Sequence, residues 1–223
     1  MSLWLGLLVG CVGVLSDGPG EAKDGVAKER PPDIFLFTVD TLRADHLPIY
    51  GYARDTAPWL TSLAEQGLVF DNAYGTSSWT VPSVASMLTG MLPHQLGVRT
   101  PPVKNAAIRP RLPDAAETVA EWLKGSGYAT YAITSNAHLD TSQGFGQGFD
   151  FYQNVVFAPA QAVAKGVGEI REQVEDSRAP VFVWIHLFDP HDPYFRHEPW
   201  FDSWDPTYDE YVSDLGRGPD IES

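Results

Sequence analysis

The segment DIFLFTVD, residues 33–40, is a nearly continuous apolar run that ends in a carboxylate. Two further runs have the same character, ATYAITSN at residues 129–136 and VFVWIHLF at residues 181–188. Short apolar runs of this kind are typical of strands that are buried on both faces, as in a parallel sheet. The three runs therefore predict the strands of a buried, mostly parallel sheet.

Helical patterns lie between these runs. Apolar residues recur at helical spacing within residues 57–67, 114–127 and 159–176, and the first two of these stretches end in glycine. Strands that alternate with helices are typical of a layered α/β domain with right-handed crossovers. We therefore expect an α/β fold, with a mostly parallel sheet flanked by helices.

The composition limits the possible functions. A chain of 223 residues with 43% hydrophobic residues is long enough for one domain with a proper core. Its formal net charge of -14 argues against a nucleic-acid partner, which would require a basic face. The same charge would repel an anionic substrate, so an anion site would need a local cation. The only cysteine, Cys11, excludes a disulfide framework and a cysteine-rich zinc site.

Residues 1–15 contain an apolar run that is too short to span a bilayer comfortably, and they predict an export signal. The stretch LVGC, residues 8–11, resembles the bacterial lipobox, in which the cysteine is acylated; a plain cleaved signal is the alternative. Residues 16–32 are rich in glycine, proline and charge, and predict a flexible tether. We expect an exported protein of the periplasm or cell envelope, with a possible membrane anchor at Cys11.

Polar side chains follow all three predicted strands. In open α/β sheets, ligands bind outside the carboxyl ends of the strands. The alternative is that strand ends are loops, and loops are polar in any protein. The residues in question are Asp40, Thr41, Asn136, His138, His186, Asp189 and His191.

The stretch SSWTVPSVASMLTG, residues 77–90, places hydroxyl residues immediately ahead of an apolar helix. In one interpretation Thr80 or Ser83 caps the helix and Pro82 lies in its first turn. In the other, a hydroxyl is held at a helix N-terminus, where backbone N–H groups and the helix dipole favour an anion. These residues alone leave both interpretations open.

The residue types at the strand ends suit metal-assisted chemistry. Asp40 is an oxygen ligand for calcium, magnesium or manganese, and nearby imidazole would also allow zinc; its alternative role is a turn cap. A metal beside Thr80 would help its hydroxyl to act as a nucleophile. The histidines could protonate a leaving group or bind the oxygens of a sulfate or phosphate. We interpret His186, inside an apolar strand, as a core residue.

From about Pro32 to Tyr194 the chain resembles the N-terminal half of sulfatases and their relatives in the alkaline-phosphatase superfamily. The resemblance rests on TVDTLRADHLPIYGY and WTVPSVASMLTG, supported by GFGQGFDFY and HLFDPHDPY. It implies an alkaline-phosphatase-like α/β domain over residues 33–223. It also implies a metal-dependent hydrolase or transferase that acts on sulfate or phosphate esters of a small molecule, glycan or lipid.

The resemblance also implies roles for single residues. Asp40 corresponds to the first metal-binding aspartate of the family. Thr80 falls where sulfatases hold the cysteine or serine that is oxidised to formylglycine, so the resemblance implies a catalytic nucleophile that also contacts the metal. Pro82 and Ser83 match the proline and serine of that motif, and Ser83 is implied in substrate binding.

Residues near the second and third predicted strands match further family positions. His138 falls where the family often has the histidine of a Lys-Trp-His-Leu stretch, and Asn136 replaces the lysine of that stretch. His191 matches the histidine of the family's Pro-His-x-Pro segment. The resemblance thus implies catalytic roles for His138 and His191 and substrate binding by Asn136.

Several positions depart from the family pattern. Thr80 cannot become formylglycine, and relatives that transfer phosphoethanolamine or phosphoglycerol use a threonine here, so sulfate and phosphate esters both stay open. Val84 replaces an arginine, and Thr41 replaces the second aspartate of the acidic pair. The family's later Asp-His-Gly or Asp-Asn segment does not occur before the end at GRGPDIES. We therefore also expect C-terminal truncation, and the alternative function is an inactive, envelope-tethered domain of the same fold.

Overall fold

The computed structural model describes residues 8–9, 13–15, 30–98, 110–156, 160–175 and 178–192. Its main strands are β3 (Asp33–Val39), β4 (Ala129–Thr134), β5 (Phe151–Asn154) and β6 (Val181–Leu187), with short segments β1 (Leu8–Val9) and β2 (Gly13–Leu15). Its α-helices are α1 (Pro58–Ala64), α2 (Thr80–Thr89), α3 (Val119–Gly125) and α4 (Ala160–Glu175). Three single 3₁₀ turns cover Ala44–His46, Pro48–Tyr50 and Thr141–Gln143.

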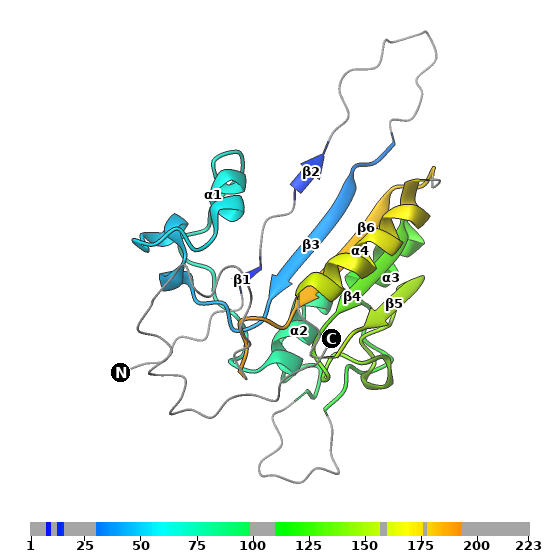
Figure 1. Cartoon of the computed structure of the whole chain (residues 1–223). Coiled ribbons are helices and arrows are strands. Elements are labelled where there is room, and N and C mark those ends of the chain that lie inside the picture. The colour runs from blue at the N-terminus through cyan, green and yellow to red at the C-terminus, as the bar shows by residue number, and fades with distance from the viewer. Residues whose placement is uncertain are drawn as a thin grey trace, which may run out of the picture.

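The four main strands form a parallel sheet in the order β3-β6-β4-β5 (Figure 1). β1 and β2 pair antiparallel with β3 at one edge. The predicted α/β class, with a mostly parallel sheet flanked by helices, is confirmed, and each of the three predicted strands is present. The edge strand β5 was not predicted, because its four residues are all half-buried and do not form an apolar run.

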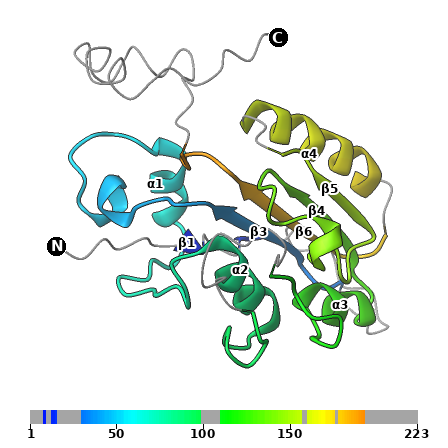
Figure 2. The same cartoon turned by 90° about the horizontal axis from the view of Figure 1, so that it is seen from below.

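Helices cover both faces of the sheet (Figure 2). On one face, α2 and α3 contribute Val84, Leu88 and Leu123 to a core that includes Trp184 of β6. The helix α4 covers the other face with a second set of apolar side chains, packed against β4 and β6. The continuous apolar runs in the sequence reflect this burial on both sides.

The helix predicted over residues 114–127 is shorter than expected and begins at Val119. A capping box sets this start: the Thr118 hydroxyl accepts a hydrogen bond from the Glu121 N–H at 3.1 Å, and the Glu121 carboxylate accepts from the Thr118 N–H at 2.8 Å. These bonds satisfy amide groups that have no partner within the helix. The prediction was therefore wrong at the N-terminal end of this helix.

Parts of the sequence predictions fall on residues that the structure does not describe. Cys11, most of the proposed export signal, residues 16–29 of the tether and residues 193–223 lie outside the described residues. The export signal, the tether and the lipid anchor stay predictions. Within the described part of the chain, every helix is too short or too polar to cross a membrane.

Candidate active site

The carboxyl ends of three neighbouring strands bring the polar side chains together. Asp40 directly follows β3, Asn136 follows β4, and His186 lies one residue before the end of β6. The Asp40 N–H donates to the Leu187 carbonyl at 2.9 Å, which extends the pairing of β3 with β6 beyond the strand. This bond fixes the backbone of Asp40 at the edge of the sheet where ligands bind in α/β folds.

Helix α2 presents Thr80 to this edge. Trp79 is the N-cap residue of α2 and makes no side-chain cap bond, so Thr80 is the first helical residue. The Thr80 hydroxyl donates to Asp40 Oδ2 at 3.0 Å, with Oδ1 at 3.4 Å, and both residues are buried. The interpretation of Thr80 as a helix cap is therefore wrong, because its hydroxyl contacts a carboxylate from another element.

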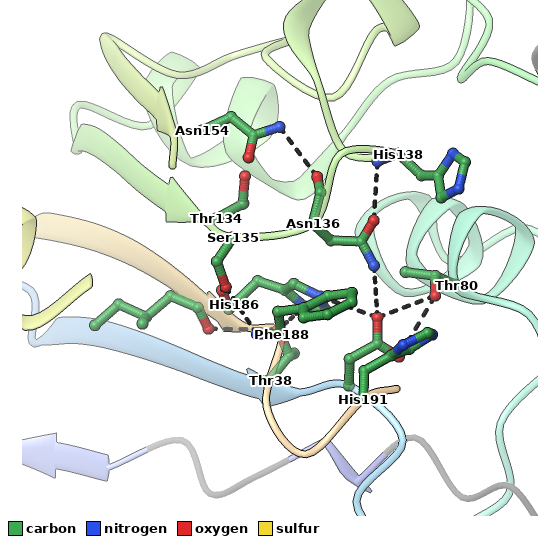
Figure 3. Close-up of polar contacts among 12 residues, drawn as sticks. Thr38, Thr80, Thr134, Ser135, Asn136, His138, Asn154, His186, Phe188 and His191 are labelled. Carbon is green, nitrogen blue, oxygen red and sulfur yellow. Dashed lines mark hydrogen bonds and ion pairs between the residues drawn. The ribbon is translucent and has the colours of Figure 1, made fainter. Parts of the chain in front are cut away.

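Asn136 donates to the same carboxylate oxygen as Thr80 (Figure 3). Its amide Nδ2 donates to Asp40 Oδ2 at 2.7 Å, and its Oδ1 accepts from the His138 N–H at 2.8 Å. A backbone N–H can only donate, so this contact fixes which end of the Asn136 amide faces Asp40. Asn154 of β5 donates to the Asn136 carbonyl at 3.0 Å and ties the turn to the edge strand.

Asp40 is a buried negative charge without a strong cation beside it. Burial alone would raise the pKa of its carboxyl, but contacts with His186, Asn136 and Thr80 outweigh this and hold the pKa below the usual value of 3.8. Asp40 is therefore ionised at neutral pH. Among the described residues, its side-chain partners include no lysine or arginine.

His186 is fully buried, as its position in an apolar strand predicted, but its hydrogen bonding is incomplete. Its Nδ1 lies 2.8 Å from the Thr38 hydroxyl, while its Nε2 has no hydrogen-bond partner among the described residues. Nε2 lies 3.5 Å from Asp40 Oδ2. His186 is thus a core residue, as interpreted, and its ring also faces the Asp40 carboxylate.

When the strands are aligned, His186 forms part of a row of polar residues. Thr38, His186 and Thr134 occupy matching positions on three neighbouring strands, in one polar row near the carboxyl ends. A polar row inside otherwise apolar strands marks an edge that does not serve packing alone. The row becomes visible only once the register of the strands is known.

The predicted catalytic histidines lie at the rim of the site (Figure 3). His138 is exposed, and its ring packs edge-on against Trp79, with ring centres 6.1 Å apart. His191 is half-buried and stacks on Phe188, with ring centres 4.5 Å apart, while its N–H donates to the Phe188 carbonyl. Aromatic contacts thus hold both rings next to the elements that carry Thr80 and His186.

Ser83 lies in a different environment from Thr80, although it is only one turn further along α2. It is buried and lines a cavity of about 200 Å³ together with Tyr74, Ser86 and Met87. Asp40 and Thr80 do not line this cavity. The role of Ser83 in substrate binding stays a prediction.

The turn after Asp40 is conformationally strained. Thr41 has a φ of 53°, in the left-handed region that β-branched residues avoid. Backbone strain of this kind is often found at functional sites, where the surrounding structure enforces it. Here it accompanies the residue that carries the buried charge.

The structure combines a parallel α/β sheet with a buried hydroxyl–carboxylate pair at its carboxyl edge, between a strand end and the first residue of α2. Residues 32–215 match the family model described as Sulfatase, and the chain belongs to the sulfatase family. The predicted family and its alkaline-phosphatase-like fold are thereby confirmed.

Known proteins resemble this chain over part of their length. Arylsulfatase A of Homo sapiens is 42% identical over 106 residues, which are 48% of this chain and 21% of that protein. N-acetylgalactosamine-6-O-sulfatase of Bacteroides thetaiotaomicron is 35% identical over 118 residues, which are 52% of this chain and 22% of that protein. The matches thus span about a fifth of these relatives.

Among solved structures, Ps i-CgsB in complex with k-i-k-neocarrahexaose superposes with a TM-score of 0.62. The match covers 85% of this chain and 49% of that chain, at 16% sequence identity. At this identity the likeness concerns the fold alone.

Proposed function

We propose that this protein is a metal-dependent hydrolase or transferase of sulfate or phosphate esters, with Thr80 as its nucleophile. The observation that carries the proposal is the hydrogen bond of 3.0 Å from the buried Thr80 hydroxyl to Asp40. Membership of the sulfatase family supports the reaction class. The substrates of these relatives are not assigned to this chain, because the matches cover about a fifth of the relatives' length.

The position of Thr80 suits a nucleophile. Its hydroxyl proton points at an ionised carboxylate, so the oxygen lone pairs are available to an incoming group. Thr80 is also the first residue of α2, where amide groups without helical partners and the helix dipole favour an anion. A sulfate or phosphate group would therefore be stabilised where the hydroxyl can reach it.

A divalent cation fits this site in part. Among the described residues, no group of three or more histidine, cysteine, aspartate or glutamate side chains could hold a metal. The donors that do converge are the Asp40 carboxylate and the Thr80 hydroxyl. A cation bound there would lower the pKa of the Thr80 hydroxyl and neutralise charge on the transferring group. Calcium, magnesium, manganese and zinc are the candidates.

In the proposed reaction, Thr80 Oγ1 forms a bond to the sulfur or phosphorus as the bond to the leaving oxygen breaks. The hydroxyl proton departs along the hydrogen bond to Asp40. His138 or His191, at the rim, donates a proton to the leaving oxygen. Attack of water on the threonine ester would complete hydrolysis, and attack of an alcohol would complete transfer. The reaction does not use formylglycine, because Thr80 has no route to it.

Substitution of Thr80 tests this proposal. We expect Thr80→Ala to lower turnover of aryl sulfate or aryl phosphate esters, assayed with each candidate cation, by at least about 10³-fold, since nucleophile removal is among the costliest changes in an enzyme. Thr89→Ala is the matched control, because Thr89 lies at the other end of α2, where its hydroxyl donates to the Ala85 carbonyl and accepts from the Met91 N–H. Circular dichroism should show the same fold for both variants.

Other outcomes of this assay would reject the proposal. Equal turnover by Thr80→Ala and the unchanged protein would exclude Thr80 as nucleophile. If the unchanged protein turned over no ester with any cation, the alternative of a catalytically inactive domain of the same fold would be favoured.

We also propose an exported location, in the periplasm or cell envelope, with a possible membrane tether through Cys11. The apolar segment before Cys11 supports export. The proposed substrate is a small-molecule, glycan or lipid ester, and the net charge of -14 argues against a nucleic acid. Intact mass of the mature protein would test the anchor, because acylation of Cys11 adds hydrocarbon mass and removes the first ten residues.

A further inference from the structure

The imidazole of His186 lies between the hydrophobic core and the buried charge of Asp40. The side chain is fully buried, and its two ring nitrogens face different groups. Nδ1 lies 2.8 Å from the Thr38 hydroxyl (Figure 3), and Nε2 lies 3.5 Å from Asp40 Oδ2. In a neutral imidazole one nitrogen donates and the other accepts, so the position of the ring proton decides how His186 acts on Asp40.

The contacts of Thr38 favour a proton on Nε2. The Trp184 indole N–H, which can only donate, lies 3.0 Å from Thr38 Oγ1, so this oxygen is already an acceptor. The single Thr38 proton can go to His186 Nδ1 at 2.8 Å or to the Ile185 carbonyl at 3.3 Å. The contact with Nδ1 is shorter, and Ile185 belongs to a strand that is paired on both sides, so its carbonyl does not depend on Thr38. With Nδ1 as the acceptor, the ring N–H is at Nε2 and faces Asp40.

The charge on Asp40 favours the same arrangement. A lone pair of Nε2 at 3.5 Å would repel an ionised carboxylate in a buried site, whereas an N–H attracts it. Burial raises the pKa of Asp40, and the contact with His186 is the largest of the influences that lower it. The separation is longer than the roughly 2.7–3.2 Å of an ordinary protein hydrogen bond, and catalytic hydrogen bonds are often long in sites without substrate.

We propose that His186 is a positioning residue of the active site, which donates from Nε2 to Asp40 and so orients this carboxylate toward Thr80. The inference rests on the proposed function, and it adds a residue to that site. Asn136 donates to the same oxygen at 2.7 Å from the turn after β4, and Thr80 donates to it at 3.0 Å from α2. With His186 on β6, donors from three separate elements converge on Asp40 Oδ2 and fix the rotation of the carboxylate.

The core holds His186 in the orientation that this role requires. Thr38 contacts one side of the ring, and Trp184 in turn fixes Thr38. The backbone is fixed as well, because the His186 carbonyl accepts from the N–H and from the hydroxyl of Ser135, both at 3.1 Å. The ring therefore turns away from Asp40 only if contacts in the core break. Functional groups held to a precise geometry depend on supporting residues that are locked in this way.

Steady-state kinetics of the full chain on one aryl ester tests the positioning role. His186→Leu should lower kcat by at least about tenfold and leave KM within about threefold, because the lost hydrogen bond to a charged group acts on the reacting site and not on substrate binding. His186→Gln should recover most of this loss, since its amide can place an N–H near the position of Nε2. Phe182→Leu is the matched control, because Phe182 is buried on the same face of β6 but lies toward the amino end of the strand, and its turnover should stay close to that of the unchanged protein.

Each outcome of these kinetics has a separate meaning. Equal turnover by His186→Leu and the unchanged protein would overturn the proposal while leaving the ester chemistry of Thr80 intact. Equal losses in His186→Leu and His186→Gln would also overturn it, because the loss would then reflect packing and not a donor. If the unchanged protein turned over no ester, the proposed function would be rejected, and the positioning role with it.

The position of the ring proton can be measured without any ester, and this measurement applies if His186→Leu does not fold. Nitrogen-15 NMR distinguishes protonated from unprotonated ring nitrogens, and the signal of His186 is identified in a full chain whose other five histidines are replaced by glutamine. A protonated Nε2 with an unprotonated Nδ1 at pH 7 would support the proposal. A protonated Nδ1 would overturn it, whether or not the protein turns over an ester.

Discussion

The two aspartates at the ends of strand β3 differ in how their charges are compensated. Asp33, at the amino end, has a side chain that is 26% exposed, pairs with Arg30 at 2.8 Å and accepts from the Val181 N–H at 2.9 Å. Asp40, just past the carboxyl end, has a side chain that is 5% exposed, and its contacts are Thr80, Asn136 and His186. Asp33 thus has a permanent cation beside it, whereas Asp40 has no lysine or arginine partner among the described residues.

A second carboxylate at the amino edge of the sheet is, like Asp33, paired with a cation. Asp150, immediately before β5, pairs with Lys124 at 2.6 Å and accepts from the Thr130 N–H and hydroxyl. Burying a charge without a full partner is costly. The structure therefore distinguishes a structural edge, where these two charges are paired with cations, from the carboxyl edge with Asp40, which we propose as the functional edge.

The largest expected effect of this difference is on turnover. Asp40→Asn should lower ester turnover by roughly 10³-fold or more, because a lost metal ligand removes several kcal/mol of charge stabilisation. Asp33→Asn, the same change at the other end of β3, should leave turnover within about threefold of the unchanged protein because it lies away from the transferring group. Steady-state kinetics on one aryl ester would compare them. Similar losses in both variants would remove the distinction between the two edges.

The next effect is on stabilisation by a cation. A divalent cation at about a hundred times its Kd should stabilise the protein by about 2.7 kcal/mol, which raises the melting temperature by roughly 5–10 °C for a chain of this size. Asp40→Asn should abolish this increase, and Asp33→Asn should retain it. Differential scanning fluorimetry with and without chelator measures the shift. An equal shift in Asp40→Asn would place the cation elsewhere.

A smaller effect concerns the structural edge. Burial alone would raise the pKa of Asp150, but contacts with Lys124 and Thr130 outweigh it and hold the pKa below 3.8. A lowered pKa in the folded state means that Asp150 stabilises the protein above about pH 4 and that this contribution is lost as the pH falls through the folded pKa. Because the side chain is 42% exposed, solvent screening limits the effect to about 0.5–1 kcal/mol.

Urea unfolding of Asp150→Asn at two pH values tests this effect. The variant should be less stable than the unchanged protein at pH 7, and the difference should shrink at pH 3. A difference that stayed constant between the two pH values would mean that the Asp150 charge plays no part.

The sequence predicted the layers of the fold and much of the functional edge, because both depend on local patterns. Continuous apolar runs marked three strands, and the polar residues after them included Asp40 and Asn136, which the structure brings together. The proximity of His186 to Asp40 could not be predicted, since it depends on the register that aligns β6 with β3. The sequence left open whether Thr80 caps α2, because threonine is a good cap, and only the tertiary fold shows its hydroxyl on Asp40.

The smallest expected effect concerns the strain that accompanies the functional edge. Thr41 holds a φ of 53°, which asparagine tolerates better than a β-branched residue, so Thr41→Asn should raise stability by about 0.5–1 kcal/mol and the melting temperature by roughly 1–4 °C. A lower melting temperature would mean that contacts of the threonine side chain outweigh the strain. The ester turnover of Thr41→Asn shows whether the backbone strain at Thr41 has a functional role. A gain in stability with unchanged turnover would make the strained turn incidental, whereas a gain accompanied by slower turnover would show that the turn helps to aim Asp40 at its ligand.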